Sequence, residues 1–586
     1  MIMATTTQAH SKAQAHDQPD CHAVLQVRGL SLDFHLRTHI LHAVRDVSFD
    51  LYKGRTLCLV GESGSGKSVT ARALMRIVDG PGSIVSGTIT LNTDGEPLDV
   101  TALPEKSKEI LNIRGGKIGL IFQEPMSSLS PVHTIGSQII EVLMLHRAMT
   151  KKQARAATIE LLGQVEIPNP EAMIDRYTFE FSGGMRQRAM IAMALACDPD
   201  ILIADEPTTA LDVTTQADIL DLIKRLQVSR GMAMLLITHD LGVVAEVADE
   251  VAVMRFGRIV ESGPVDSVFH APQHPYTKRL LDSTLKLEEG RKVSGSGPNA
   301  RAGAPILSVR DVSKVYGGTS GWFGKTGYAL KAVDNVSFDL YPGENLGIVG
   351  ESGSGKTTLG RLILRVTEPS AGSITYRPDD QGEVDVLSLE KAKLRDFHRQ
   401  VRLVFQDPFA SLNPRMTVKQ VIADPLVVAG ELSRKQIDQK VAELLELVGL
   451  DPMAMERYPH AFSGGQRQRI GIARALALEP KIIVADEATS ALDGSIRSQI
   501  LDLLLDVQTK LGLSYLFISH DISTVRYFCD RVAVMHKGKI VELDSAETIC
   551  TAPREAYTQS LISAVPSPDP RAKRMLHRTR FKLKEA

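Results

Sequence analysis

The sequence lacks three features that would each indicate a particular class of protein. Lys and Arg total 68 against 69 Asp and Glu, so there is no excess of positive charge of the kind that nucleic-acid binders carry. The longest wholly apolar run, residues 189–197, is far shorter than the ~18 to 20 residues that span a bilayer, and we expect no transmembrane segment. The five cysteines include no CxxC pair, which disfavours a disulfide framework and a zinc site.

The composition that is present is that of a soluble globular protein. Hydrophobic residues make up 43% and charged residues 23% of the 586 positions. This length exceeds the ~250 to 300 residues at which a single core stops growing, so we expect several domains. Residues 1–22 are polar and carry no apolar core or cleavage site, which predicts a disordered arm and no secretory signal.

The chain contains a long internal repeat. GESGSGKS at residues 61–68 recurs as GESGSGKT at residues 350–357, and FSGG and ADE recur in the same order, each displaced by 281 positions. A stretch rich in Gly, Ser and Pro separates the two copies and predicts a flexible linker. The predicted organisation is a disordered arm at 1–22, one domain at 23–289, a linker at 290–304, a second domain at 305–570, and a basic tail at 571–586.

Each copy alternates short apolar runs with helical patterns, which predicts the α/β class with a mainly parallel sheet flanked by helices. The runs are LCLVG, IGLIF, ILIAD and MLLIT, then LGIVG, RLVFQ, IIVAD and YLFIS. Between the second and third run of the first copy, residues 151–165 place Ala157, Leu161 and Val165 on one helical face. We therefore expect a helical insertion in each copy.

The GxxxxGK[ST] pattern after an apolar strand indicates a phosphate-binding loop (P-loop). Glycines let backbone N–H groups curl around phosphates, the lysine pairs with β- and γ-phosphate oxygens, and the final hydroxyl reaches Mg²⁺. A chance Gly-rich turn is the alternative, and the recurrence in register argues against it. The predicted nucleotide-binding residues are Gly61, Ser63, Gly64, Gly66, Lys67 and Ser68, and then Gly350, Ser352, Gly353, Gly355, Lys356 and Thr357.

Two acids end each of the runs ILIADE and IIVADE, at the carboxyl ends of the predicted strands beside the P-loop. Asp205 and Asp486 are expected to hold Mg²⁺ directly or through water. Glu206 and Glu487 are expected to act as general bases on the attacking water. A solvated acidic turn is the alternative for either run taken alone.

FSGG precedes a helical pattern in both copies. In the first copy, Ser182 is a suitable N-cap, and Met190, Ile191, Ala194 and Leu195 share one face. Such a helix start attracts anions, although a motif of this kind is more often only a capped helix.

Taken together, the motifs resemble a tandem pair of ATP-binding cassettes of ABC transporters. The resemblance rests on the P-loops, on Gln123 in IFQEP and Gln406 in VFQDP, on FSGGM and FSGGQ, on ADEPTTALD and ADEATSALD, and on His239 and His520 after the last strand. It covers roughly residues 23–570. IFQEPMSSLSP and APQHPYTKRLL resemble the dipeptide, oligopeptide and nickel importer family, in the fused form similar to glutathione and microcin C importer ATPases; the second copy departs to APREAYTQSLI.

The resemblance implies two P-loop domains, each with a RecA-like core and a helical subdomain, that close head to tail around two ATP molecules. Site one then combines Lys67, Ser68, Gln123, Asp205, Glu206 and His239 with Ser463, Gly464, Gly465 and Gln466. Site two combines Lys356, Thr357, Gln406, Asp486, Glu487 and His520 with Ser182, Gly183, Gly184 and Met185. The implied Mg²⁺ ligands are Ser68, Gln123 and Asp205, and Thr357, Gln406 and Asp486. Phe34 and Tyr316 lie where the family stacks an aromatic ring on adenine, with a core role as the alternative.

The implied function is that of the ATP-hydrolysing subunit of an importer, with ATP and Mg²⁺ as cofactors. Its implied partners are two transmembrane permease subunits and, indirectly, an extracytoplasmic solute-binding protein, and its implied place is the cytoplasmic face of the inner membrane. A peptide cargo is the family expectation, with sugars and metal complexes left open. The alternative is a soluble tandem-cassette ATPase acting on ribosomes or DNA, which the short linker and the near-neutral charge disfavour.

Two further surfaces are expected to meet the membrane subunits or the membrane. Segments 124–129 and 407–412 lie where coupling helices seat in the family, with Met126, Leu129, Phe409 and Leu412 as apolar surface or else as ordinary packing. The tail at 571–586 carries seven Lys or Arg and one Glu, which fits either contact with anionic lipid or a solvated tail. The family often carries a cysteine cluster after the cassette; no such cluster follows here, so we expect no iron–sulfur or zinc centre.

Overall fold

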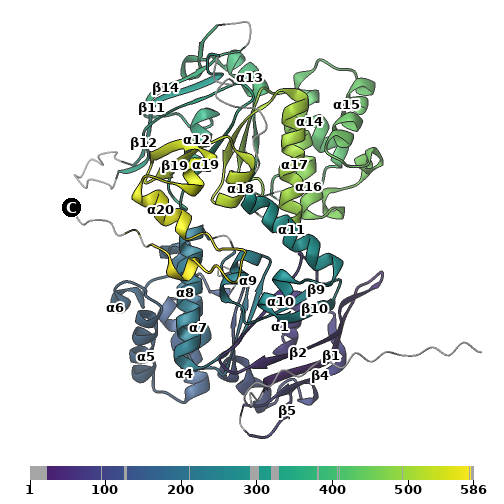
Figure 1. The fold of residues 1–586 in the computed structure, drawn as a ribbon, viewed down its shortest axis with the longest axis vertical. Coiled ribbons are helices and arrows are strands. Elements are labelled where there is room, and N and C mark those ends of the chain that lie inside the picture. The colour runs from purple at the N-terminus through teal and green to yellow at the C-terminus, as the bar shows by residue number, and fades with distance from the viewer. Residues whose placement is uncertain are drawn as a thin grey trace, which may run out of the picture.

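A computed structural model describes residues 23–93, 95–124, 128–209, 211–290, 303–317, 329–378, 382–405, 407, 410–490, 492–579 and 581 (Figure 1). The predicted arm at 1–22 and most of the predicted linker lie outside these residues, as do Met126, Gln406 and Phe409. We refer to residues 23–289 as the first repeat and to residues 305–570 as the second.

Each repeat contains a six-stranded sheet and a four-stranded sheet. In the first repeat the orders are β10-β9-β3-β8-β7-β6 and β2-β1-β4-β5. The bounds are β1 (Ala23–His35), β2 (Ile40–Tyr52), β3 (Thr56–Val60), β4 (Gly82–Leu91), β5 (Leu98–Asp99), β6 (Ile118–Ile121), β7 (Ile201–Asp205), β8 (Ala233–Thr238), β9 (Glu250–Arg255) and β10 (Arg258–Pro264). The six-stranded sheet is parallel except for its edge strand β10.

The second repeat has the same topology, with the orders β16-β17-β18-β13-β19-β20 and β12-β11-β14-β15. The bounds are β11 (Leu307–Tyr316), β12 (Leu330–Leu340), β13 (Asn345–Val349), β14 (Ala371–Tyr376), β15 (Val384–Asp385), β16 (Val401–Val404), β17 (Ile482–Asp486), β18 (Ser514–Ile518), β19 (Arg531–His536) and β20 (Lys539–Ser545). All eight apolar runs predicted as strands are strands of the parallel sheets.

The four-stranded sheets were not predicted as separate layers. Their long strands alternate buried positions with partly buried or exposed ones, as β1 and β12 do, whereas β3 and β8 are buried throughout. Antiparallel sheets commonly bury one face only, and parallel strands between helices bury both. The alternation in the sequence before each P-loop therefore marked a sheet of a different kind.

Helices flank the sheets and form the predicted insertions. The first repeat contains α1 (Lys67–Leu74), α2 (Lys108–Asn112), α4 (Ile135–Arg147), α5 (Lys151–Gln164), α6 (Pro170–Met173), α7 (Gly183–Leu195), α8 (Val213–Arg230), α9 (Leu241–Val247), α10 (Val265–His270) and α11 (Pro275–Glu289). The second contains α12 (Lys356–Ile363), α13 (Lys391–Gln400), α14 (Val418–Ala429), α15 (Arg434–Leu447), α16 (Gly464–Leu476), α17 (Gly494–Leu511), α18 (Ile522–Phe528), α19 (Ala546–Thr551) and α20 (Ala556–Ser563).

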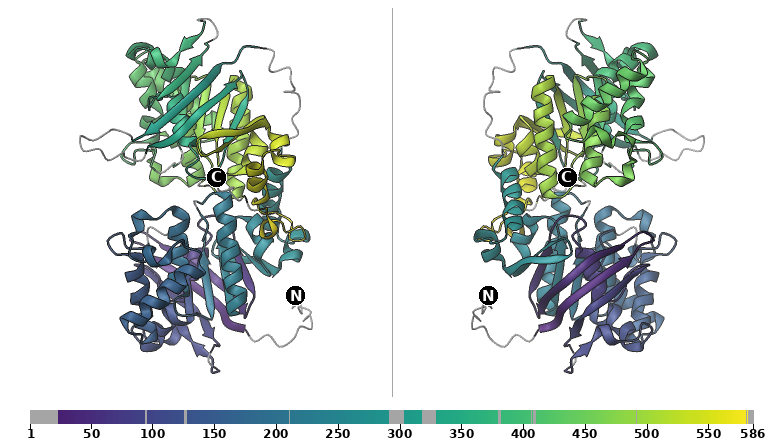
Figure 2. Two further views of the ribbon diagram at one scale, coloured as in Figure 1. Left: turned by 90° about the vertical axis from the view of Figure 1, so that its left-hand side faces the viewer. Right: turned by 90° about the vertical axis from the view of Figure 1, so that its right-hand side faces the viewer.

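The two repeats face each other head to tail. In Figure 1 the helical layer of the second repeat (α14–α16) lies on the right and that of the first (α4–α7) lies on the left, while the four-stranded sheets take the opposite sides. The side views in Figure 2 show one repeat above the other, with α11 and the C-terminal segment along one side of their boundary. None of the helices that the structure describes is both long and apolar enough to cross a membrane.

At this boundary, each repeat receives apolar side chains from the other half of the sequence into its hydrophobic core. Leu287, near the end of α11 in the first repeat, belongs to the apolar cluster of the second repeat. Met575, from the segment after α20, is fully buried in the apolar cluster of the first repeat. Figure 1 shows α11 reaching up to α18 and the yellow C-terminal segment running down toward α8 and α9.

The segment predicted as a basic tail is partly packed on the first repeat. Arg571 donates to both carboxylate oxygens of Asp266, at 2.5 and 2.7 Å, and Arg578 forms an ion pair with Asp218. Together with the burial of Met575, these contacts correct the interpretation of a tail free in solvent for the described residues 571–579. Local charge attracted these arginines to acidic helix residues, which the net charge of the tail alone did not reveal.

Candidate nucleotide-binding sites

The P-loop of the first repeat connects β3 to α1. Gly66 adopts φ 104°, and a Cβ there would lie 2.5 Å from the carbonyl oxygen of Ala43, so only glycine fits this turn. The Lys67 Nζ is buried and donates to the carbonyl oxygens of Gly61 and Glu62, at 2.7 and 2.9 Å. Burial lowers the pKa of Lys67, opposed by nearby carboxylates that favour its charged form. A cation is thereby held at the start of a helix, where phosphate binds.

The P-loop of the second repeat has the same geometry. Gly355 also adopts φ 104°, and Lys356 Nζ donates to the carbonyl oxygens of Gly350 and Glu351, at 2.7 and 2.8 Å. Burial lowers the pKa of Lys356 as well. The two predicted loops are therefore alike in backbone and in the placement of their lysines.

Each P-loop hydroxyl meets the first of the two predicted acids. Ser68 Oγ donates to Asp205 Oδ1 at 2.9 Å, and Thr357 Oγ1 donates to Asp486 Oδ1 at 3.3 Å. Burial raises the pKa of both carboxyl groups. A hydroxyl and a carboxylate side by side offer hard oxygen donors of the kind that Mg²⁺ prefers, so the residues present fit that ion.

Glu206 is the centre of a polar cluster in the first repeat. Its backbone adopts φ 47°, in the left-handed region that non-glycine residues adopt uncommonly. The carboxylate lies 3.2 Å from His239 Nδ1 and accepts from Gln123 Nε2 at 2.9 Å and from Thr209 Oγ1 at 2.8 Å. Burial alone would raise the pKa of Glu206, but the hydrogen bond and charge of His239 outweigh burial and lower this pKa to about 2. Glu206 is therefore ionised at neutral pH.

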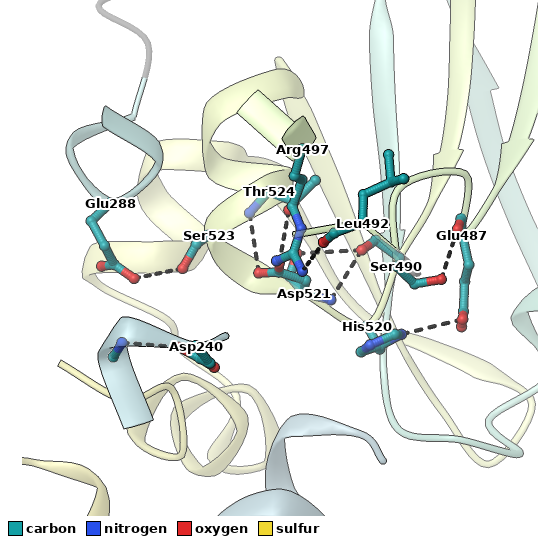
Figure 3. Close-up of polar contacts among 12 residues, drawn as sticks. Asp240, Glu288, Glu487, Ser490, Leu492, Arg497, His520, Asp521, Ser523 and Thr524 are labelled. Carbon is teal, nitrogen blue, oxygen red and sulfur yellow. Dashed lines mark hydrogen bonds and ion pairs between the residues drawn. The ribbon is translucent and has the colours of Figure 1, made fainter. Parts of the chain in front are cut away.

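Glu487 repeats this arrangement in the second repeat (Figure 3). Its φ is 49°, and its carboxylate lies 3.3 Å from His520 Nδ1. His520 outweighs the effect of burial and lowers the pKa of Glu487. Gln406, predicted to complete this site, lies outside the described residues.

The two FSGG turns begin helices as predicted, but they differ in their capping. Ser182 caps α7 by accepting from the backbone N–H of Met185 at 3.3 Å. Ser463 caps α16 in the same way, and its own N–H also donates to Gln466 Oε1 at 3.1 Å, which completes a capping box. Met185 offers no such oxygen, so the first-repeat helix lacks half of this motif. Gly183, Gly184, Gly464 and Gly465 form the first turns of the two helices.

Contacts cross between each P-loop and the other repeat. The N–H of Ser63 donates to Asp493 Oδ2 at 2.8 Å, and the N–H of Ser352 donates to Asp212 Oδ2 at 3.4 Å. Ser495 Oγ also donates to Glu62 Oε1 at 2.7 Å. Asp212 and Asp493 were not predicted as site residues, although both end an ALD triplet that recurs at the same displacement of 281 as the acids before it.

Two tyrosines also contact the P-loops and were not predicted. The N–H of Glu62 donates to Tyr276 Oη at 3.1 Å, and the N–H of Glu351 donates to Tyr557 Oη at 3.2 Å. Both tyrosines follow the last sheet strand of their repeat, in APQHPYTKRLL and APREAYTQSLI. These two segments share Ala-Pro, Tyr-Thr and the leucine three residues after the threonine, and the shared YT was the available signal.

The two predicted adenine-stacking residues occupy different environments. Phe34, near the end of β1, packs against the apolar cluster between the sheets of the first repeat. Tyr316, at the end of β11, is 42% exposed and has Lys314 Nζ 5.3 Å from its ring centre. The ring of Tyr316 is therefore accessible to a ligand. Phe34 at least partly fills the core, as the alternative interpretation expected.

The predicted docking surface is wrong in two of its four residues. Leu129 and Leu412 are 4% and 2% exposed, inside the apolar clusters of the first and second repeat. They pack within their own domains. Met126 and Phe409 lie outside the described residues, so their part of the prediction stays open.

A cavity of about 160 Å³ lies where the two repeats meet. Both histidines and Glu206 line it, together with Glu288 from α11 and Arg497 from α17. Arg497 forms an ion pair with Asp521 and donates to the carbonyl oxygen of Leu492 at 3.1 Å (Figure 3). Among the described residues no group of three or more His, Cys, Asp or Glu is arranged to hold a metal ion.

Comparison with known proteins agrees with this geometry. The family model described as "ABC transporter" matches twice, at residues 44–209 and 333–490, over the P-loops and both acid pairs. The chain is 48% identical over 575 residues to the glutathione import ATP-binding protein GsiA of Salmonella paratyphi A, covering 94% of this chain and 91% of that protein. The chain belongs to the ATP-binding proteins of ABC transporters.

A second relative and a second family model refine this assignment. The GsiA protein of Escherichia coli O157:H7 is 47% identical over 578 residues, covering 95% of this chain and 92% of its own length. The model described as "Oligopeptide/dipeptide transporter, C-terminal region" matches residues 260–305 and 541–584, which include Tyr276 and Tyr557. The predicted family and its importer branch are confirmed, and the alternative of an ATPase acting on ribosomes or DNA finds no support.

A solved ABC cassette corresponds to part of the chain. The dimeric ATP-binding cassette MJ0796 bound to ADP and Pi is 29% identical, covering 41% of this chain and 99% of its own, with a TM-score of 0.36. As members of this family, the two repeats are ATP-binding cassettes, and the chain is an ATPase whose hydrolysis is coupled to import.

Proposed function

We propose that this chain drives the import of a small peptide by hydrolysing ATP at two composite sites, one built around each P-loop. The observation that carries the two-site arrangement is the reciprocal pair of contacts from Ser63 to Asp493 and from Ser352 to Asp212. Each P-loop thereby faces the other cassette, which is the geometry that a shared nucleotide requires. For site one and site two we propose the residue sets that the family resemblance implies.

At site one, Lys67 and the N–H groups of the P-loop bind the β- and γ-phosphates. Ser68, Asp205 and Gln123 are the proposed ligands of Mg²⁺, which when bound would offset phosphate charge. Glu206, ionised by its contact with His239, accepts a hydrogen bond from the attacking water and orients it. His239 lines the cavity beside Glu206, and its proposed role is to donate to the γ-phosphate.

Site two uses the corresponding residues of the second cassette. Lys356 would bind phosphate, and Thr357, Asp486 and Gln406 would hold Mg²⁺. Glu487 with His520 orients water. The helix starts at Ser463 and Ser182, with the glycines that follow them, supply N–H groups to the γ-phosphate of site one and site two respectively. Tyr316 is the stronger candidate for stacking on adenine, because its ring is exposed.

The proposed cargo is a peptide of a few residues, and glutathione is the first compound to test. The relatives at 47% to 48% identity are named for glutathione import, and the C-terminal family model is named for oligopeptides and dipeptides. The proposed partners are two transmembrane permease subunits, with an extracytoplasmic solute-binding protein acting through them. The chain would then sit at the cytoplasmic face of the inner membrane as a peripheral subunit.

Transport by the reconstituted complex tests this function. The chain is assembled in proteoliposomes with the permease and solute-binding proteins encoded beside its gene, and uptake of glutathione and of dipeptides is measured with and without ATP. ATP-dependent uptake of one of these compounds is the expected result, and the Glu206→Gln, Glu487→Gln double variant is the matched control. An assembled complex that hydrolyses ATP but takes up only sugars or metal complexes would contradict the peptide assignment.

A further inference from the structure

Tyr276 and Tyr557 occupy equivalent buried positions at the two P-loops. Each is the second residue of a helix, α11 or α20, and each accepts the N–H of the glutamate that follows the first P-loop glycine. Arg255 lies 4.8 Å from the ring centre of Tyr276, and His536 stacks on Tyr557 at 4.0 Å. Because each ring is buried and packed against one of these groups, the position of its hydroxyl is constrained.

The segment before each tyrosine is anchored to its own cassette. Glu261 on β10 accepts the backbone N–H groups of Gln273 and His274, at 2.7 and 3.1 Å. Glu542 on β20 accepts the equivalent N–H groups of Arg554 and Glu555, at 2.8 and 3.2 Å. We call α11 the extension of the first cassette, and α20 with the residues that follow it the extension of the second. The start of each extension is therefore tied both to the sheet edge and to the P-loop.

The first extension, α11, then runs into the second cassette. Its middle residues Leu280 and Leu281 lie in the first core, whereas Leu287 lies in the second. At its end, Glu288 Oε1 accepts from Ser523 Oγ at 2.5 Å (Figure 3). The carbonyl oxygen of Glu288 also accepts from Arg526 Nη1 at 2.8 Å. One helix thus links the P-loop of site one to α18.

Helix α18 begins directly after the histidine of site two. Asp521, the residue after His520, caps α18 by accepting from the N–H of Thr524 at 3.2 Å. Ser523, which contacts Glu288, lies three positions after His520 in the sequence. A displacement of the end of α11 would therefore act on the turn that carries His520.

The second extension makes the mirror-image connection. From Tyr557 the chain continues through α20 to residues 565–579, where Glu246 Oε1 accepts the backbone N–H groups of Ser567, Arg574 and Met575 at 3.0, 2.9 and 3.0 Å. Glu246 is 1% exposed and lies in α9, which begins directly after His239 and Asp240. Each extension thus reaches the helix that follows the histidine of the opposite site.

We propose that Tyr276 and Tyr557 are positioning residues that tie the P-loop of each site to the histidine turn of the other. The proposal rests on the roles proposed above for the P-loops and the histidines. Coupling between distant sites is carried by packed side chains and rigid helices, and α11 and the second extension supply such continuous paths. Phosphate binding at one P-loop would shift the tyrosine hydroxyl, and the extension would pass this shift to the opposite site.

The test measures each site separately in the full-length chain. Glu206→Gln leaves hydrolysis to site two, and Glu487→Gln leaves it to site one. Tyr276→Phe keeps the ring and removes the hydroxyl acceptor. In the Glu206→Gln background we expect Tyr276→Phe to lower kcat at site two by about 3- to 10-fold with KM for ATP little changed, because the altered tyrosine belongs to the other P-loop.

Tyr557→Phe provides the matched comparison. In the Glu206→Gln background it alters the P-loop of the site that is hydrolysing, so it should chiefly raise KM. In the Glu487→Gln background we expect the reverse: Tyr276→Phe should chiefly raise KM, and Tyr557→Phe should chiefly lower kcat. Leu285→Ala, at an exposed position of α11, should change neither constant. If Tyr276→Phe affects only KM, and only in the Glu487→Gln background, the tyrosine acts locally and the proposal is overturned.

The far end of the path gives a second check. Ser523→Ala should reproduce the kcat effect of Tyr276→Phe in the Glu206→Gln background, and the double variant should fall no further than either single one. If the effects of Ser523→Ala and Tyr276→Phe on kcat were independent and additive, the contacts of these two residues would not belong to one path. Failure of the proposed function is recognised separately, since both acid variants would then keep full hydrolysis before any tyrosine is changed.

Amide hydrogen exchange covers the case in which one acid variant stops hydrolysis at both sites. Lys356→Ala prevents binding at site two, and ATP is then added to occupy site one alone. We expect exchange in residues 522–528 to change on ATP addition, and Tyr276→Phe to abolish that change while ATP still binds. An exchange response that is the same with and without the Tyr276 hydroxyl contradicts the proposal.

Discussion

The backbone N–H of Ser63 donates a hydrogen bond of 2.8 Å to the carboxylate of Asp493, although 430 positions separate the two residues. Ser63 belongs to the P-loop of the first cassette, and Asp493 precedes α17 of the second. The reciprocal contact from Ser352 to Asp212 is longer, at 3.4 Å. Each cassette therefore holds the phosphate-binding loop of the other, and a change in one P-loop is felt across the boundary.

The first prediction concerns the acids that lie beside the histidines. Glu206→Gln and Glu487→Gln should each reduce ATP hydrolysis, and the double variant should hydrolyse ~10² to 10⁴-fold more slowly, because loss of a general base typically has an effect of that size. ATP binding should survive, since the P-loop lysines are unchanged. Phosphate release and nucleotide binding are measured on the same preparation, and near wild-type turnover in the double variant would refute the assignment.

A second prediction concerns the unequal helix caps at Ser182 and Ser463. Met185→Gln should create the capping box that Gln466 forms in α16 and raise the free energy of unfolding by roughly 0.3 to 1.5 kcal/mol. Gln466→Met is the matched variant and should lower the free energy of unfolding by a similar amount.

Site two should hydrolyse ATP in the unaltered chain, because the N–H groups of Gly183 and Gly184 remain. Site-resolved nucleotide trapping without turnover at Lys356 would contradict this.

Met575 provides a prediction about stability. This side chain is fully buried in the core of the first cassette, so Met575→Ala should lower the free energy of unfolding by about 2 to 5 kcal/mol. Lys573→Ala, two residues away and exposed, should change it by no more than ~0.5 kcal/mol. Denaturant unfolding of the full chain compares the two, and equal midpoints would show that the C-terminal segment does not pack as described.

The last prediction concerns metal content. Cys58, Cys197 and Cys529 are buried, Cys550 is half-buried, and none of these four forms a disulfide. Elemental analysis of the purified protein should find neither iron nor zinc in stoichiometric amount, and chelation of Mg²⁺ should abolish hydrolysis. Stoichiometric iron or zinc that resists dialysis would overturn this prediction.

Sequence reasoning located the parts of the site that lie within one motif. Lys67 lies at the end of the loop after β3, Asp205 is the last residue of β7 and His239 follows β8, and parallel strands bring their carboxyl ends to one edge of the sheet. The contacts of Tyr276 and Asp493 could not be derived in this way, because they join segments 214 and 430 positions apart. A local pattern shows that a side chain is apolar or acidic, and only the tertiary fold decides which loop it meets.

The same limit explains the error at Leu129 and Leu412. An apolar residue in a turn is compatible with a docking surface and with core packing, and periodicity does not separate these outcomes over so short a segment. The helical pattern of α11 shows which face is buried, but not that its last turn enters the core of the other cassette.

The reciprocal placement of Leu287 and Met575 also bears on how this chain denatures. Two domains with separate cores melt as two units, whereas here one apolar cluster in each half also takes in residues from the other half. The chain is therefore expected to melt in one cooperative transition. If the backbone were cut between the halves, each half would become a ligand that stabilises the other, and the melting temperature would rise with protein concentration.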